Sequence, residues 1–125
     1  MLENTNNPRD GKLMPLYETV FIARQDLSAK VVEDMAKNCG KIVNDNGGEL
    51  KNVESWGIRT LAYKINKNRK AHYTLMHLDA SPKAIAEMER QMKLNEDILR
   101  FMTVRIEVLP KEPSAILRSF DQDRN

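Results

Sequence analysis

Four segments typical of β-strands and two typical of amphipathic helices follow one another along the 125-residue chain in the order β-α-β-β-α-β. This order predicts an α+β fold of the ferredoxin-like type, a four-stranded antiparallel sheet with two helices on one face. Right-handed connections between strands favour the same arrangement. We expect a flexible N-terminal extension over residues 1–14, a ferredoxin-like domain over residues 15–110 and a polar C-terminal tail over residues 111–125.

The first predicted strand covers residues 16–24 and is rich in aromatic and β-branched residues. One face carries Tyr17, Thr19, Phe21 and Ala23, and the other carries Leu16, Glu18, Val20 and Ile22. Both faces are largely apolar, although the two helices cover only one of them. We therefore expect Leu16, Val20 and Ile22 to form an apolar patch in water, which is typical of a partner-binding surface. The alternative is that a tail folds over this patch.

Two helices are predicted from their capping residues and apolar stripes. The first follows a cap at Asp26 or Ser28 and ends near Asn46, before two glycines. The second begins at Ser81-Pro82 and ends near Asn95. The expected buried stripes are Val31, Met35, Cys39 and Ile42 on the first helix, and Ile85, Met88 and Met92 on the second.

The middle of the chain predicts a long β-hairpin. Residues 49–66 form its first strand, in which Gly57 predicts a bulge or bend, residues 67–70 form its turn, and residues 71–80 return. Strict alternation places Val53, Leu61, Tyr63 and Ile65 on one face of the first hairpin strand and Trp56, Ile58 and Ala62 on the other. Residues 98–109 are expected to form the last strand of the sheet.

The distribution of charge is more informative than the net charge, which is only +2. Five basic residues and no acidic residue lie between Ser55 and Leu78: Arg59, Lys64, Lys67, Arg69 and Lys70. A local basic tip suits a phosphate-binding protein, although a solvated loop is the plainer interpretation. Tyr63 and Tyr73 flank the tip, and aromatic rings beside cations suit RNA because bases stack on the rings.

No pattern of residues indicates catalysis or metal binding. His72 and His77 lie five residues apart on one predicted strand, so they point to opposite faces. Cys39 is the only cysteine, which excludes disulfide scaffolds and thiolate clusters. No nucleotide-binding glycine motif is present, and no apolar stretch is long enough to span a membrane. We predict no enzyme activity, no cofactor and no metal.

Several motifs resemble those of the bacterial-type small-subunit ribosomal protein six family. The hairpin motifs are Trp56-Gly57, Arg59, Leu61-Ala62-Tyr63, Ile65-Asn66-Lys67 and Lys70-Ala71-His72-Tyr73. Tyr17-Glu18-Thr19-Val20-Phe21 resembles the first strand of that family, and residues 94–100 resemble its entry into the last strand. The resemblance covers residues 15–114. Within the family, the sequence is similar to members of the alphaproteobacterial or mitochondrial branch.

This resemblance implies the fold described above and a structural constituent of the small ribosomal subunit. Family members bind the central domain of the small-subunit ribosomal RNA, in the platform, together with small-subunit ribosomal protein eighteen. The implied location is the ribosome of the bacterial cytoplasm or of the mitochondrial matrix. The expected contacts with RNA or the partner are Tyr17, Arg59, Lys64, Lys67, Arg69, Lys70, Arg100 and Arg105.

Two other classes of function are compatible with the same fold. One is a module that self-associates through the uncovered face of its sheet. The other is a small acyl-phosphate hydrolase, which would need a glycine-rich anion loop after the first strand. Arg24 is present there, but the glycines are absent and Asp26 would repel a phosphate.

Overall fold

The computed structural model describes residues 15–109, and their six elements follow the predicted order. In sequence they are β2 (Leu16–Arg24), α1 (Ala29–Asp45), β3 (Glu49–Ile65), β4 (Asn68–Asp79), α2 (Pro82–Leu94) and β5 (Ile98–Ile106). The last strand is thus shorter than predicted and ends at Ile106 rather than Leu109. The predicted N-terminal extension and the whole of the predicted C-terminal tail lie outside the described residues. No helix within residues 15–109 is both long and apolar enough to cross a membrane.

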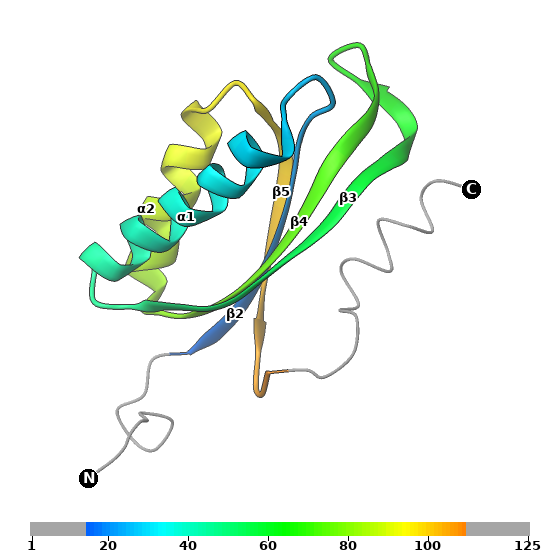
Figure 1. Ribbon diagram of the computed structural model, residues 1–125. Coiled ribbons are helices and arrows are strands. Elements are labelled where there is room, and N and C mark those ends of the chain that lie inside the picture. The colour runs from blue at the N-terminus through cyan, green and yellow to red at the C-terminus, as the bar shows by residue number, and fades with distance from the viewer. Residues whose placement is uncertain (1–14, 110–125) are drawn as a thin grey trace, which may run out of the picture.

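The four strands form one antiparallel sheet in the order β3-β4-β2-β5. Both helices lie on the same face of this sheet, and the opposite face carries no helix (Figure 1). We call this opposite face the open face. The arrangement confirms the predicted ferredoxin-like fold and places β3 and β5 at the two edges of the sheet.

The main core lies between the helices and the sheet. Phe21 of β2, Met76 of β4 and Met88 of α2 are completely buried there. Each such side chain stabilises the fold by roughly 1.5–3 kcal/mol through its removal from water. Both helices begin as predicted, because the hydroxyl oxygens of Ser28 and Ser81 accept hydrogen bonds from the first-turn amides at 3.2 and 3.1 Å.

The buried stripe of α1 is partly as predicted, because Cys39 and Ile42 are buried, but it is rotated at the start of the helix. Val31 is 41% exposed, whereas its neighbour Val32 is buried together with Ala36 and Gly40. The rotation brings the small residues of α1 against the sheet. A Cβ atom added to Gly40 would lie 2.7 Å from Leu50 Cδ2, so a larger residue at this position would require the Leu50 side chain to move.

A second, smaller core occupies the open face, and it contradicts the prediction of an exposed patch. Val20 and Ile22 are only 0% and 1% exposed, and Leu16 is also buried. The long hairpin supplies much of this burial, because it brings apolar side chains of β3 and β4 onto the central strand. These side chains are Trp56, Leu61, Ile65, Ala71, Tyr73 and Leu75. Exposed apolar residues of the open face lie instead on the edge strands, with Met102 and Val104 of β5 at 41% and 37% exposed and Tyr63 of β3 at 82%.

The predicted bulge at Gly57 is confirmed, and its consequence corrects the predicted faces of β3. Gly57 has a φ angle of +73°, and the pairing of β3 with β4 shifts between Ser55 and Gly57. A shift of one residue moves every following side chain to the other face. Trp56 before the bulge and Leu61 after it therefore both pack on the open face, although strict alternation had separated them.

The hairpin turn lies at Asn66-Lys67, before the predicted turn at residues 67–70. Both residues have positive φ angles, 46° and 70°, as in the two-residue turns that match the twist of a hairpin. Asn68 already pairs with Ile65, so Arg69 and Lys70 belong to β4 rather than to the turn.

Candidate nucleic-acid interface

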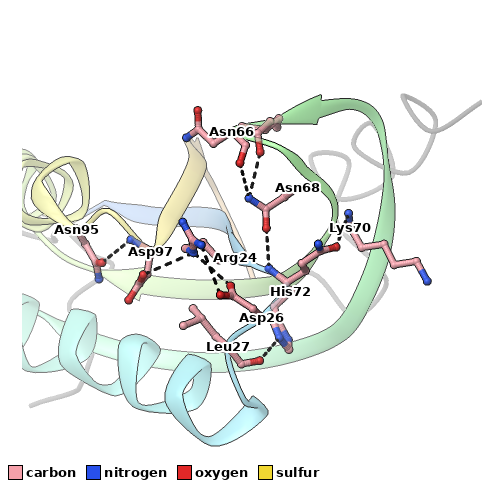
Figure 2. Close-up of polar contacts among 11 residues, drawn as sticks. Arg24, Asp26, Leu27, Asn66, Asn68, Lys70, His72, Asn95 and Asp97 are labelled. Carbon is pink, nitrogen blue, oxygen red and sulfur yellow. Dashed lines mark hydrogen bonds and ion pairs between the residues drawn. The ribbon is translucent and has the colours of Figure 1, made fainter.

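The tip of the hairpin is held by the buried side chain of Asn68. Its amide group donates hydrogen bonds to the carbonyl oxygens of Ile65 and Asn66 at 3.2 and 3.0 Å, and these bonds close the turn. Its side-chain oxygen accepts a hydrogen bond from the backbone N–H of Gln25 at 3.1 Å, which ties the turn to the loop after β2 (Figure 2). The turn is therefore fixed in the fold from both sides.

Two more bonds join the hairpin to the loop between β2 and α1. The backbone N–H of Lys70 donates to the side-chain oxygen of Gln25 at 3.2 Å. The Nε2 atom of His72 lies 2.7 Å from the carbonyl oxygen of Leu27 (Figure 2). Because a carbonyl oxygen only accepts, Nε2 carries the proton in this bond. These contacts hold the backbone that presents the basic residues.

Arg24 is engaged at the same end of the molecule. Its guanidinium donates to the carboxylate of Asp26 at 3.2 and 3.4 Å, and it lies 4.0 Å from Asp97. The hydrogen bond from Arg24 lowers the pKa of Asp26 below its ordinary value. The charges of Asp26 and Arg24 therefore cancel, so this pair adds nothing to the net charge of the hairpin end.

An arginine stacks on the single tryptophan of the open face. Arg59 Cζ lies 4.8 Å from the centroid of the Trp56 ring, which is a cation–π contact. The ring is oriented by a hydrogen bond from Trp56 Nε1 to Glu54 Oε1 at 3.2 Å. The structure places Trp56 half-buried at the margin of the second core.

A chain of hydrogen bonds extends from this tryptophan into the sheet. Asn52 Nδ2 donates to the second carboxylate oxygen of Glu54 at 3.1 Å and to Nδ1 of His77 at 3.2 Å. Nε2 of His77 lies 2.9 Å from Glu18 Oε1, and both side chains are buried. Since Nδ1 accepts from Asn52, Nε2 donates to the Glu18 carboxylate and the ring is neutral in this arrangement.

Six of the eight predicted contact residues gather at the hairpin end of the molecule: Arg59, Lys64, Lys67, Arg69, Lys70 and Arg100. Arg100 pairs with Ile22 and lines a hollow of about 170 Å³ on the open face, together with Tyr73 of β4 and the largely exposed Tyr63 of β3. Two aromatic rings and one guanidinium group thus meet here, as expected for a surface that contacts nucleotides.

The other two predicted residues lie elsewhere. Tyr17 pairs with Arg105, at the end of β2 remote from the hairpin, and Tyr17 packs against the main core on the helix-bearing side. The structure does not bring these two residues to the hairpin end. His72 and His77 lie on opposite faces, as predicted, and no group of three metal-binding side chains occurs within residues 15–109.

Comparison with known proteins agrees with the resemblance seen in the sequence. Residues 16–105 match the family model described as ribosomal protein S6. The small ribosomal subunit protein bS6 of Methylorubrum extorquens strain PA1 is 54% identical over 110 residues, which cover 88% of this chain and 73% of that protein. The corresponding protein of Bartonella bacilliformis is 52% identical over 110 residues, covering 88% and 81%.

Two solved structures share the fold. The crystal structure of 30S ribosomal protein S6 from Thermotoga maritima superposes with a TM-score of 0.69 at 26% identity, covering 74% of this chain and 88% of that one. The C-terminal domain of the MgtC protein from Mycobacterium tuberculosis gives a TM-score of 0.55 at 13% identity, covering 82% and 99%, which shows the fold alone. From the family match and the close alphaproteobacterial relatives, the chain belongs to the ribosomal protein S6 family, in its alphaproteobacterial branch.

Proposed function

We propose that this protein is a structural component of the small ribosomal subunit that binds ribosomal RNA and a partner protein. In this proposal the hairpin end contacts the central domain of the small-subunit RNA, and the open face contacts small-subunit ribosomal protein eighteen. The family is one of ribosomal proteins, and its alphaproteobacterial members indicate the ribosome of the bacterial cytoplasm rather than a mitochondrial one. We propose no catalytic activity for the chain.

The basic end of the hairpin carries the RNA part of this proposal. Lys64, Lys67, Arg69 and Lys70 are all exposed and lie within seven residues around a fixed turn. Cationic side chains on a fixed backbone are well suited to phosphate contacts. A segment with a mobile backbone would lose more conformational entropy on binding than a segment that the fold already holds in place. The bonds of Asn68 and Gln25 hold the backbone of this turn, and the aromatic rings beside it offer surfaces on which bases stack.

The exposed apolar side chains of β5 support the proposed binding of a partner protein. Met102 and Val104 lie side by side on the open face, at an edge strand whose outer backbone is not paired with another described strand. An apolar patch beside a basic region suits a protein that is bound jointly with RNA. This surface is smaller than the sequence predicted and is displaced from β2 to β5.

The RNA contact is tested by replacing Lys67, Arg69 and Lys70 together with alanine. The affinity for a fragment of the central domain should fall, and the salt dependence of binding should become shallower because fewer counterions are released. If each residue contacts one phosphate, the slope of log K against log[salt] falls by about 2.7. Filter binding at several salt concentrations measures both quantities.

A matched variant separates this effect from a simple loss of positive charge. Lys41, Lys83 and Lys93 are three exposed lysines that belong to the helices and not to the hairpin. Their joint replacement with alanine should leave the affinity and its salt dependence close to those of the unmodified protein. Equal effects of the two triple variants would show that the hairpin is not the RNA contact.

The two rival functions make different predictions. Arg24 is already bound to Asp26, so the residues after β2 do not form the anion loop that an acyl-phosphate hydrolase needs. Self-association through the open face would give a concentration-dependent dimer without RNA, and sedimentation equilibrium detects it. A monomer that associates only with RNA and small-subunit ribosomal protein eighteen is the result expected here.

A further inference from the structure

A row of polar side chains crosses three neighbouring strands on the open face. Glu18 of β2 pairs with His77 of β4, and His77 pairs in turn with Asn52 of β3. His77 Nε2 lies 2.9 Å from Glu18 Oε1, and His77 Nδ1 lies 3.2 Å from Asn52 Nδ2. Glu18 and His77 are only 3% and 2% exposed, whereas Asn52 is exposed. The row therefore has a buried inner end and an accessible outer end on the edge strand.

The carboxylates in this network fix the direction of every hydrogen bond. Those of Glu18 and Glu54 only accept, so His77 Nε2 donates to the first and Asn52 Nδ2 donates to the second. Asn52 uses the other hydrogen of the same amide for His77 Nδ1. The remaining oxygen of Glu54 accepts from Trp56 Nε1 at 3.2 Å. Each group thus has one favoured orientation, and the indole ring is held at the outer end.

The buried pair gives the network a fixed point. A carboxylate and an imidazole lose their hydration on burial, and two apolar residues at the same positions would avoid that cost. A polar network whose members all have partners instead specifies one arrangement of the groups that it joins. The outer bonds would be weak on their own, because water competes for the exposed side chains of Asn52 and Glu54. The outer groups are therefore oriented from the buried end.

The outer end carries the stack of Arg59 on Trp56, which depends on the bulge at Gly57. In a regular strand, residues three apart point to opposite faces. The bulge brings Arg59 onto the face of Trp56, where its Cζ lies 4.8 Å from the ring centroid. Glu54 binds the edge of the indole ring, whereas Arg59 lies over its face. Stacking engages only the flat side of a guanidinium, and the N–H groups in its plane have the fork geometry that matches a phosphate.

We propose that the stack of Arg59 on Trp56 binds a phosphate group of the ribosomal RNA. His77 and Asn52 are positioning residues for this contact, because they fix the indole ring through Glu54 without touching the RNA. The inference rests on the proposed RNA-binding function and extends the RNA contact from the hairpin turn to the middle of β3. An RNA phosphate is favoured over an acidic protein segment, because Arg59 lies at the same end of the molecule as the exposed basic residues of the hairpin.

The test uses Asn52→Ala, which breaks the network at an exposed position and removes no charge. Trp56 is the only tryptophan, so its fluorescence reports on the ring directly. Acrylamide should quench this fluorescence more strongly in Asn52→Ala than in the unmodified protein. The affinity for a fragment of the central domain should fall about fivefold, as for the release of one immobilised side chain. The melting temperature should change little, because Asn52 is exposed.

A double-mutant cycle with Arg59 shows whether Asn52 acts through the stack. Arg59→Ala removes the phosphate contact, so the slope of log K against log[salt] should become shallower by about 0.9. In that background Asn52→Ala should have no further effect on RNA affinity, because no stack is left to hold. A merely structural role for Asn52 would instead give effects of the two substitutions that add.

Two further variants provide a rescue and a control. His77→Gln keeps a donor for Glu18 and an acceptor for Asn52, so it should retain most of the RNA affinity and of the protection from acrylamide. Ser55 is exposed and lies on the helix-bearing side of β3, opposite Thr74. Ser55→Ala should therefore change neither quantity. Equal effects of Ser55→Ala and Asn52→Ala would contradict a role for the network.

Three results would overturn the inference. If Asn52→Ala changes neither quenching nor RNA affinity while the variant with alanine at Lys67, Arg69 and Lys70 loses affinity, the proposed function stands and the positioning role fails. If Asn52→Ala and Arg59→Ala weaken binding of small-subunit ribosomal protein eighteen but not of the RNA, the stack is a protein contact and the phosphate assignment fails. If the chain does not bind the RNA, the proposed function and the phosphate contact fail together, and the quenching of Asn52→Ala still measures whether the network holds the ring.

Discussion

Asn68 shows how one buried polar side chain fixes a functional surface. It closes the hairpin turn with two hydrogen bonds and joins it to the loop after β2 with a third. We expect Asn68→Ala to lower the free energy of unfolding by about 1–3 kcal/mol, because buried carbonyl and N–H groups lose their partner. It should also weaken RNA binding although no charge is removed. Urea denaturation and filter binding measure the two effects.

Asn44 provides the comparison for this substitution. It is an exposed residue near the end of α1, and alanine favours the helix slightly more than asparagine does. Asn44→Ala should therefore leave the free energy of unfolding nearly unchanged. If Asn68→Ala costs no more than this control, its hydrogen bonds do not hold the hairpin in solution.

The pKa of the Cys39 thiol depends on its burial in the main core. Burial raises the pKa of its thiol from about 9 to about 11, because the thiolate is poorly solvated there. The unfolded chain therefore releases this proton at lower pH than the folded chain does. The contribution to stability is complete below pH 9 and is lost as the pH rises from 9 to 11.

This acidity predicts slow alkylation of Cys39 by iodoacetamide at pH 8 in the folded protein and rapid alkylation in urea. Mass spectrometry at timed intervals measures both rates. Rapid alkylation without urea, at the rate of a small-molecule thiol, would contradict the burial of Cys39 between α1 and the sheet.

At the scale of elements, the hairpin contains three residues with positive φ angles, Gly57, Asn66 and Lys67, and two of them provide tests of backbone strain. Gly57 has a φ of +73° and open space where a Cβ would lie, so Gly57→Ala tests backbone strain alone. We expect it to destabilise the protein by about 1 kcal/mol. Lys67 has a φ of +70° without being glycine, so Lys67→Gly should stabilise the protein by about the same amount.

Thermal denaturation of these two single variants and of the double variant provides the test. The positions are distant in the hairpin, so their effects should add. Equal melting temperatures for Gly57→Ala and the unmodified protein would contradict the bulge, because a regular strand accepts alanine at that position without strain.

The elements also show what the sequence can and cannot predict. Their order, caps and approximate bounds follow from local patterns, such as Ser81-Pro82 before α2 and the glycines after α1. The faces of the β3 residues after Gly57 cannot be predicted from local patterns. The sequence does not show whether a bulge adds an extra residue to the strand, and that extra residue reverses the alternation of all the side chains after it. The rotation of α1 depends on the close approach of Gly40 to Leu50, a contact between separate elements.

At the scale of the whole molecule, the basic end of the hairpin was predictable because its charges lie close together in the sequence. The separation of Tyr17 and Arg105 from that end depends on the register of β2 with β5, which no local pattern specifies. The burial of Val20 and Ile22 was not predictable for a related reason. It depends on the hairpin bringing Trp56, Leu61 and Ile65 onto the open face.

The most direct test of the central claim is sedimentation of a bacterial lysate on a sucrose gradient in high salt, with this chain followed by antibody. The account predicts that the chain migrates with the small ribosomal subunit, and that the variant with alanine at Lys67, Arg69 and Lys70 is partly released. A chain that stays at the top of the gradient as a free monomer or dimer would contradict the account. Membership of the family would then describe the fold and not the function.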